Sequence, residues 1–321
     1  MVRTAEISRY GSAALWILAV AAVYYGAARL GLLQQLVRGQ VTPLWPPTGV
    51  ALAGLFVFGL RIWPGIALGA LLVNASLGPS VLAVLAIAAG NTLAPVCAYL
   101  LLRRAQFREE LDRLRDVLAL VFLGALAGML ISSTAGSGVL VLSGALDASE
   151  FWPTWSVWWT GDAMGVLVVT PFLLVLHRAR WPHRTGIGRW IEAAALVVGT
   201  ILVTILATST TGSTLLFLTF PFLIWAAFRF QLAGAAPCAL AVSTLTILAA
   251  AREDGPFAGR DLFTNMVTLQ AFNGAAALTA LLLAAVITER NETHEEIKRV
   301  CSRLAEMVAG VEPRERADPD R

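Results

Sequence analysis

The stretch that decides the fold runs from Pro43 to Asn74 and reads PLWPPTGVALAGLFVFGLRIWPGIALGALLVN. It is almost wholly apolar, which is typical of a chain that lies in lipid. Tryptophan, proline and glycine interrupt it, and Arg61 is its single charged residue. A plain membrane anchor needs no such interruptions. The pattern therefore predicts two short membrane-spanning helices that shape a site.

The composition extends this interpretation to the whole chain of 321 residues. Hydrophobic residues make up 57% and charged residues only 14%, whereas charged residues are about a quarter of a soluble domain. The mean hydropathy is +0.72. The first apolar run, Gly11 to Ala28, is too long for a signal peptide and lacks a convincing cleavage site, so we expect it to remain as a span. These features predict a polytopic membrane protein.

Apolar runs of the length that a ~30 Å hydrocarbon core requires, or slightly shorter, occur at ten places. We therefore predict an all-α protein with about ten transmembrane helices. The second, third and eighth runs are short, so eight helices is the alternative count. The runs are Gly11 to Ala28, Trp45 to Leu60, Ile62 to Leu77, Ser80 to Leu102, Val117 to Leu142, Thr160 to Leu176, Ile191 to Thr208, Thr214 to Phe228, Leu232 to Ala250 and Phe263 to Thr288.

The arginines between the runs set the expected orientation. Placing residues 1–10 in the cytoplasm puts the two most basic connections, 103–115 and 178–189, on the cytoplasmic side as well. The integral-membrane domain then covers residues 11–288 with both termini in the cytoplasm. We expect the bacterial cytoplasmic (inner) membrane. The pI near 9.0 reflects these arginines, which meet lipid headgroups, and not a nucleic-acid partner.

An internal repeat is faintly visible. Gly59-Leu60-Arg61 ends one short run and Ala227-Phe228-Arg229 ends another, and a run rich in Gly, Ala and Pro follows each. In each group one further apolar run then follows and ends at charged residues expected on the cytoplasmic side. Because an even number of spans separates the copies, they would share one orientation, which predicts a parallel four-helix repeat.

Aromatic and acidic residues gather before and within the sixth run. Four tryptophans, Trp152, Trp155, Trp158 and Trp159, precede Asp162. Such tryptophans most often form an aromatic belt at the lipid boundary. A carboxylate in a membrane segment needs water, a cation or an arginine, and it is a functional-site hypothesis by default. Aromatic walls around one acid predict a site for a small cationic or polar organic ligand.

Arg61 and Arg229 lie in tight turns, where arginine usually reaches lipid phosphates. The alternative is that each binds a carboxylate in a neighbouring loop. Polar amides within apolar spans, such as Gln270 and Asn273, are expected mainly to hydrogen-bond between helices. The candidate ligand-binding or signalling residues are Asp162, Trp158, Trp159, Trp155, Trp45, Pro46, Arg61, Trp63, Asn74, Asn91 and Arg229.

Signatures of enzymes and metal sites are not found in the sequence. It contains no Walker loop, HExxH or GxSxG. Its three cysteines and three histidines have no metal-binding spacing. We therefore expect no catalysis, no metal and no cofactor.

The region after Thr288 is predicted to be a cytoplasmic signalling helix over 289–311, followed by a disordered tail over 312–321. Apolar residues follow the 3-4-3-4 spacing of a short coiled coil, which indicates a homodimer when the membrane part already pairs. These residues are Ile297, Val300, Leu304, Met307 and Val311.

Four motifs, in this order, resemble the membrane-associated sensor domain of the first type, a MASE-family input module found ahead of bacterial histidine kinases and diguanylate cyclases. The resemblance covers Gly11 to about Arg290. It implies a sensory role, with a kinase or cyclase as the cytoplasmic output partner. The motifs are LWPPTG (44–49), GLRIWPGIALGALLVN (59–74), GNTLAP (90–95) and WWTGDAMGVLVVTP (158–171).

Three functions fit these observations. The first is a membrane-embedded sensor that passes a ligand signal or an envelope stimulus to a cytoplasmic output through its last helix. The second is a small-solute transporter or its substrate-binding subunit, built on the repeat. The third is a scaffold whose tail recruits a soluble partner.

Overall fold

The computed structural model describes residues 2–33, 42–179, 186–210 and 215–315, which are 86% helical and contain no strand. The predicted all-helical class is confirmed. In chain order the helices are α1 (Val2–Leu32), α2 (Pro46–Phe58), η1 (Leu60–Ile62), α3 (Trp63–Asn74), α4 (Val81–Arg104), α5 (Leu114–Ala119), η2 (Leu120–Ala127), α6 (Leu130–Leu142), η3 (Ala148–Glu150), α7 (Phe151–Met164), η4 (Gly165–Val169), α8 (Thr170–Arg178), α9 (Ile187–Ser209), η5 (Leu215–Thr219), α10 (Phe220–Ala251), η6 (Gly255–Phe257) and α11 (Leu262–Glu315). Of these, η2 and η4 are π-helical.

Seven helical segments of the described chain are long and apolar enough to cross a membrane. With 13 and 12 residues, α2 and α3 are only about 20 Å long and are not among them. The count of ten spans is therefore not confirmed. The seven segments are Ala14–Leu32, Val81–Arg104, Leu114–Leu142, Ala148–Arg178, Ile187–Ser209, Leu215–Ala251 and Phe263–Met307.

The two short helices α2 and α3 run in opposite directions beside α1. The rings of Trp16 and Phe58 lie 4.9 Å apart, so the end of α2 returns to the first half of α1. A Cβ on Gly69 would lie 2.8 Å from Tyr24, so the later part of α3 meets the later part of α1. The chain reverses at Gly59, whose φ of +78° suits a residue without a side chain.

A second reversal lies inside α10, at Gln231, with φ 48° and ψ −138°. Before it, Arg229 pairs with Glu192 near the start of α9. After it, Cys238 contacts Thr200 further along α9. The predicted eighth and ninth runs are therefore the two arms of α10, within one apolar segment. The internal repeat itself is not confirmed.

Three helices extend beyond the apolar runs that the sequence marks as spans. The first begins at Val2 instead of Gly11, and the sixth begins at Phe151 instead of Thr160. Pro153 is tolerated there because it lies in the first turn of α7. The last helix continues without a break from the membrane to Glu315, into the predicted disordered tail. Residues 316–321 of that tail lie outside the described chain.

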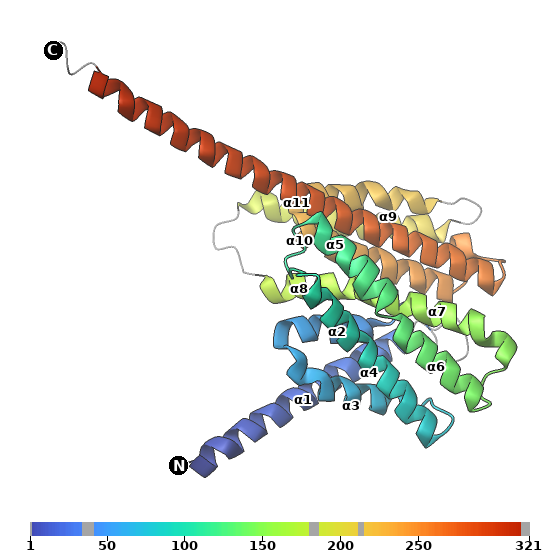
Figure 1. Cartoon of the computed structure of the whole chain (residues 1–321). Helices are drawn as coiled ribbons and strands as arrows, with labels where there is room; N and C mark the ends of the chain where they lie inside the picture. Colours follow the sequence, from blue (N-terminus) through green and yellow to red (C-terminus); the bar gives the residue numbers. More distant parts are fainter. Residues whose placement is uncertain (1, 34–41, 180–185, 211–214, 316–321) are drawn as a thin grey trace.

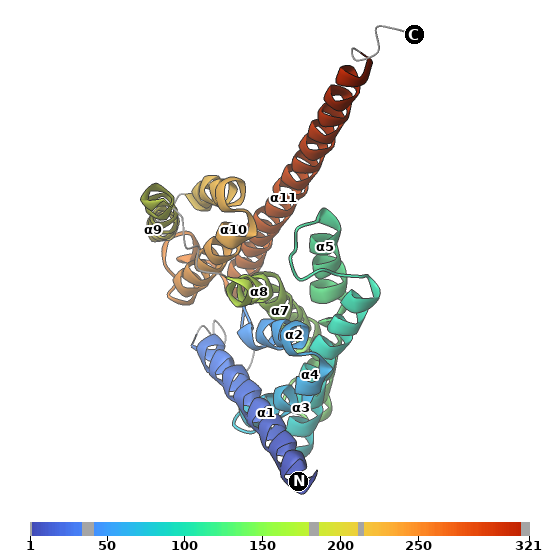
Figure 2. The same ribbon diagram turned by 90° about the vertical axis from the view of Figure 1, so that its left-hand side faces the viewer.

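The helices form two layers. Figure 2 shows α9, α10 and α11 beside the group formed by α1 to α8. The end of α11 projects far beyond the bundle, on the same side as the start of α1 (Figure 1). The site described below lies in the larger layer, whereas α11 of the smaller layer is the element that projects from the bundle.

Glycine allows α2 to pack directly against η4. A Cβ at Gly49 would lie 2.2 Å from the carbonyl oxygen of Gly165 and 2.6 Å from Val169. Small residues of this kind let helix backbones approach closely in a membrane. The position of α2 against η4 therefore depends on Gly49.

We predict that Gly49→Ala destabilises the protein by about 1–3 kcal/mol, because the added methyl group forces the two backbones apart. Gly138→Ala is the matched control, since a Cβ there meets no atom within 4 Å. Thermal unfolding in detergent measures both variants. Equal melting temperatures for the two variants would contradict this packing.

Candidate functional site

Asp162 is buried in the middle of a membrane span. It lies within one residue of the centre of the segment Ala148–Arg178, and only 1% of its surface is exposed. The sequence predicts a carboxylate in a membrane segment, and the structure buries it near the centre of that segment. A carboxylate at this depth is costly unless polar groups surround it.

Hydroxyl groups from two other helices hold the carboxylate. Thr48 Oγ1 on α2 donates to Asp162 Oδ1 at 2.6 Å, and Ser132 Oγ on α6 donates to Oδ2 at 2.5 Å. The Trp158 side chain, one turn earlier on α7, also lies close to the carboxylate. In the described part of the chain no arginine, lysine or histidine pairs with Asp162. The acid thus joins α2, α6 and α7 through neutral donors.

The segment before α2 is fixed to α7 by its backbone. Trp45 N–H donates to the carbonyl oxygen of Gly161 at 3.0 Å. A Cβ on Gly161 would lie 2.2 Å from the carbonyl oxygen of Thr42, so only glycine fits there. Thr170 Oγ1 adds a hydrogen bond to the carbonyl oxygen of Gly49 at 3.2 Å. These contacts aim Thr48 at Asp162.

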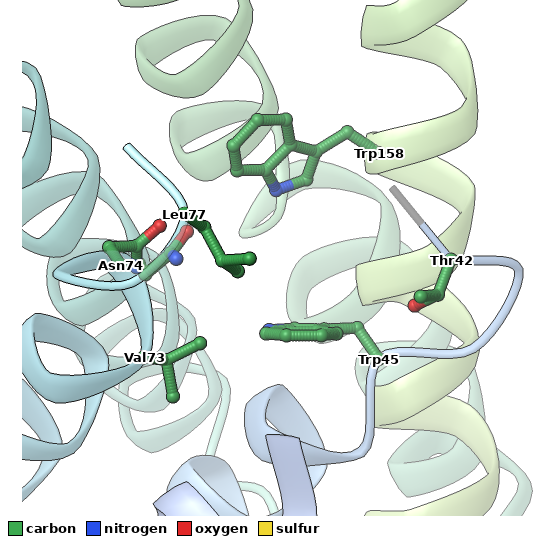
Figure 3. Close-up of a pocket in the computed structure, with 7 residues that line it drawn as sticks. Thr42, Trp45, Val73, Asn74, Leu77 and Trp158 are labelled. Atoms are coloured by element: carbon green, nitrogen blue, oxygen red, sulfur yellow. The ribbon is translucent and has the colours of Figure 1, made fainter. Parts of the chain in front are cut away.

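A small cavity opens next to this carboxylate site (Figure 3). Trp158 and Trp45 lie on two sides of it, and Asn74 faces them from the end of α3. Its volume is about 20 Å³, which accommodates about one water molecule. The lining residues are Thr42, Trp45, Val73, Asn74, Leu77, Asn91 and Trp158.

The structure brings together some of the predicted site residues. Trp45, Asn74, Asn91 and Trp158 line the cavity. Asp162 does not line it, but Trp158 belongs to both the cavity and the carboxylate site. Their role in ligand binding stays a prediction.

The other tryptophans of α7 do not enclose this site. Trp159 Nε1 donates to the carbonyl oxygen of Leu126 in η2 at 2.8 Å, and Trp155 Nε1 donates to Thr134 Oγ1 on α6 at 3.0 Å. Trp155 and Trp159 stack on each other with ring centres 5.5 Å apart. They attach α7 to the π-helical segment η2 and to α6. Of the predicted tryptophan group on α7, only Trp158 therefore lies at the carboxylate and the cavity.

The remaining candidates lie elsewhere. Pro46 starts α2. Arg61 lies in η1, which joins α2 to α3, and Trp63 starts α3; both side chains are exposed. Arg229 Nε contacts Glu192 Oε1 at 2.5 Å. An arginine bound to a carboxylate was one alternative for Arg229, but this carboxylate lies on α9 and not in a loop.

Sequence reasoning missed three residues that the site depends on. Thr48 and Ser132 were not chosen because lone hydroxyls in apolar runs usually bond to their own helix. Tyr24 on α1 is 1% exposed and lies against the Trp45 side chain. Only Thr48 had a usable signal, since it belongs to the WPPTG block.

The projecting helix α11 is hydrogen-bonded to the segment before α2, residues 42–45, which lines the cavity. Gln270 Nε2 on α11 donates to the carbonyl oxygen of Pro43 at 2.9 Å. Pro43 lies between Thr42 and Trp45, which both line the cavity. This hydrogen bond therefore joins the segment that lines the cavity to α11.

A second contact holds α11 where it leaves the other helices. The Leu114 N–H, at the start of α5, donates to Glu289 Oε2 at 3.2 Å. In the connection before α5, Arg178 from the end of α8 pairs with Glu110 at 2.7 Å. Partial burial acts to raise the pKa of Glu110, but backbone hydrogen bonding and the Arg178 charge outweigh it and leave this pKa lowered. The carboxylate therefore stays ionised and keeps this connection attached to α8.

Comparison with known families identifies the family of the chain. The sequence profile of MASE1 matches residues 16–291. The chain belongs to the MASE1 family of membrane-associated sensor domains. The resemblance seen in its four motifs is confirmed. Searches of curated proteins and of solved structures found no match.

Metal ligands do not gather in the described ranges of this MASE1 chain. No group of three or more His, Cys, Asp or Glu side chains there could hold a metal ion. The donors around the site are instead hydroxyls, amides and indoles, which suit hydrogen bonding to a neutral or weakly charged guest.

We predict that Asp162→Ala destabilises the protein by about 1–3 kcal/mol, because Thr48 and Ser132 lose their buried acceptor. Asp162→Asn keeps one acceptor oxygen and should lose less. Asp147→Ala, in an exposed connection, is the control. Thermal unfolding in detergent decides the matter, and a melting temperature for Asp162→Ala equal to that of Asp147→Ala would refute the structural role of the carboxylate.

Proposed function

We propose that this MASE1 chain is a sensory input module in which a change at the cavity moves α11 and so controls a cytoplasmic output. The observation that supports it best is the hydrogen bond from Gln270 to the carbonyl oxygen of Pro43. It joins the segment that lines the cavity to the helix that projects from the bundle.

The small volume of the cavity supplies a mechanism. A ligand shifts an equilibrium only when it binds one state better than the other. A guest larger than water requires a lining side chain to move, and Trp45 and Trp158 are the largest of these side chains. Movement of Trp45 displaces Pro43 as well, and it either carries Gln270 along or breaks its hydrogen bond. Either outcome changes the position that α11 prefers.

We place the chain in the bacterial cytoplasmic membrane with both termini in the cytoplasm. The start of α1 and the end of α11 lie on one side of the bundle, which is consistent with an even number of crossings. The reversals at Gly59 and Gln231 support ten crossings, with α2, α3 and the two arms of α10 counted separately. The basic connection before α5 leads directly into Leu114, which contacts Glu289 where α11 leaves the bundle. This connection therefore lies at the proposed cytoplasmic side, where the positive-inside rule expects basic residues.

The output part of the proposal rests on the projecting half of α11. Four apolar side chains there are 51–59% exposed and repeat at the spacing of a coiled-coil seam. We propose that a second copy of the chain covers this seam and that the pair acts on a kinase or cyclase partner. The four are Ile297, Val300, Leu304 and Met307.

The first experiment fuses the chain to a diguanylate cyclase reporter and measures its basal output in cells. We predict that Gln270→Leu changes this output at least severalfold at an unchanged membrane level, because the bond between the cavity segment and α11 is lost. Pro43→Ala is the matched control, since the backbone carbonyl group remains as acceptor.

Native output from Gln270→Leu would contradict the proposed coupling. The rival transporter function is tested with purified protein in liposomes and a panel of labelled amino acids, sugars and organic cations. Saturable uptake of one of them would replace the sensor proposal.

The second experiment tests the pairing of α11 by disulfide formation in membranes, with Cys301 replaced by serine. We predict that Ile297→Cys and Leu304→Cys form cross-linked dimers, because both residues lie on the seam. Glu295→Cys lies on the opposite face of the helix and serves as the control. Equal cross-linking at all three positions would count against a seam.

A further inference from the structure

Several buried polar atoms on α10 and α11 have no hydrogen-bond partner among the described residues. They are Ser243 Oγ on α10 and, on α11, Asn265 Oδ1 near its start and Gln270 Oε1 with Asn273 Oδ1 and Nδ2 one to two turns later. Ser243 and Asn273 are both 0% exposed. Buried polar atoms in folded proteins are nearly always paired, with protein or with ordered water.

The register of α10 and α11 brings Ser243, Gln270 and Asn273 to neighbouring levels. Gln270 and Asn273 are three residues apart, so their side chains lie on one face of α11. The second arm of α10 and α11 are antiparallel neighbours joined by the turn 252–261. α10 ends at Ala251, eight residues after Ser243, and α11 starts at Leu262, eight residues before Gln270. Ser243 therefore lies at about the level of Gln270, and Asn273 lies about one turn further along α11.

The surroundings of this group are apolar. The same two helices meet through small buried residues, which include Ala239, Val242, Ala276 and Ala280. A partner for the polar atoms must therefore come from a small guest. The available atoms comprise three oxygen acceptors, one of them a hydroxyl that also donates, and one amide donor.

We propose that Ser243, Gln270 and Asn273 form a binding site for internal water between α10 and α11. Water both donates and accepts hydrogen bonds, so it matches this mixed set, and buried waters typically make about three hydrogen bonds. A bare cation matches it less well, because it would turn the Asn273 amide donor away and would be buried without a carboxylate.

The site lies beside the coupling bond, since Gln270 uses its Nε2 for the carbonyl oxygen of Pro43 and its Oε1 for the water. Water exchanges hydrogen-bond partners easily, so α11 can shift against α10 without leaving polar atoms unpaired. This consequence rests on the proposed sensory function, whereas the water site itself does not.

The test compares the thermal unfolding of Asn273→Leu, Ser243→Ala and the double variant in detergent. With water bound, Asn273→Leu lowers the melting temperature by about 2–4 °C or more, because Ser243 and Gln270 lose their bridging partner. The double variant regains part of this loss. Thr279→Val, on the same helix, is the control and stays near the native value.

A melting temperature of Asn273→Leu that is unchanged or higher would overturn the proposal, because it would mean that the native site is dry. Repeating the scans in sodium, potassium and choline chloride separates water from a cation. Identical native values are expected, and stabilisation by sodium alone would assign the site to the ion instead. Neither result depends on reporter output, so the failure of the water site and the failure of the sensory proposal are distinguishable.

Discussion

The structure depends on how a carboxylate is accommodated in the middle of a membrane. Asp162 receives hydrogen bonds from Thr48 and Ser132, so one acid on α7 holds the preceding helix α6 and the distant helix α2. Without these donors the carboxylate would be expensive to bury, and without the close approach at Gly49 and Gly161 the donors could not reach it. The tight packing and the polar centre therefore require each other.

This centre is linked to α11 by a short series of contacts. Thr48 belongs to α2, and the segment before α2 carries both Trp45 in the cavity wall and Pro43, which accepts from Gln270. A hydrogen bond is short-ranged and directional, and we therefore propose that a shift of this segment moves α11. The sensory proposal needs only that α11 has two positions of similar free energy, since a ligand then selects one of them.

Much of this architecture was predictable from the sequence, because lipid imposes simple rules on composition and charge. The apolar runs marked the helices, and the motifs from LWPPTG to WWTGDAMGVLVVTP marked the family. The helix ends were not predictable, since α7 and α11 continue beyond their apolar cores. The partners of Asp162 were also not predictable, because contacts such as Ser132 to Asp162 depend on how distant helices pack.

The most direct test of the account is the distance between the α2–α3 turn and the projecting part of α11. Spin labels at Cys301 and at Arg61→Cys, with Cys97 replaced by serine, report it in liposomes by pulsed electron paramagnetic resonance. The account predicts that Asp162→Ala and Gln270→Leu each shift the distance distribution away from that of the labelled parent. Superimposable distributions for all three proteins would contradict the claim that the buried site controls α11.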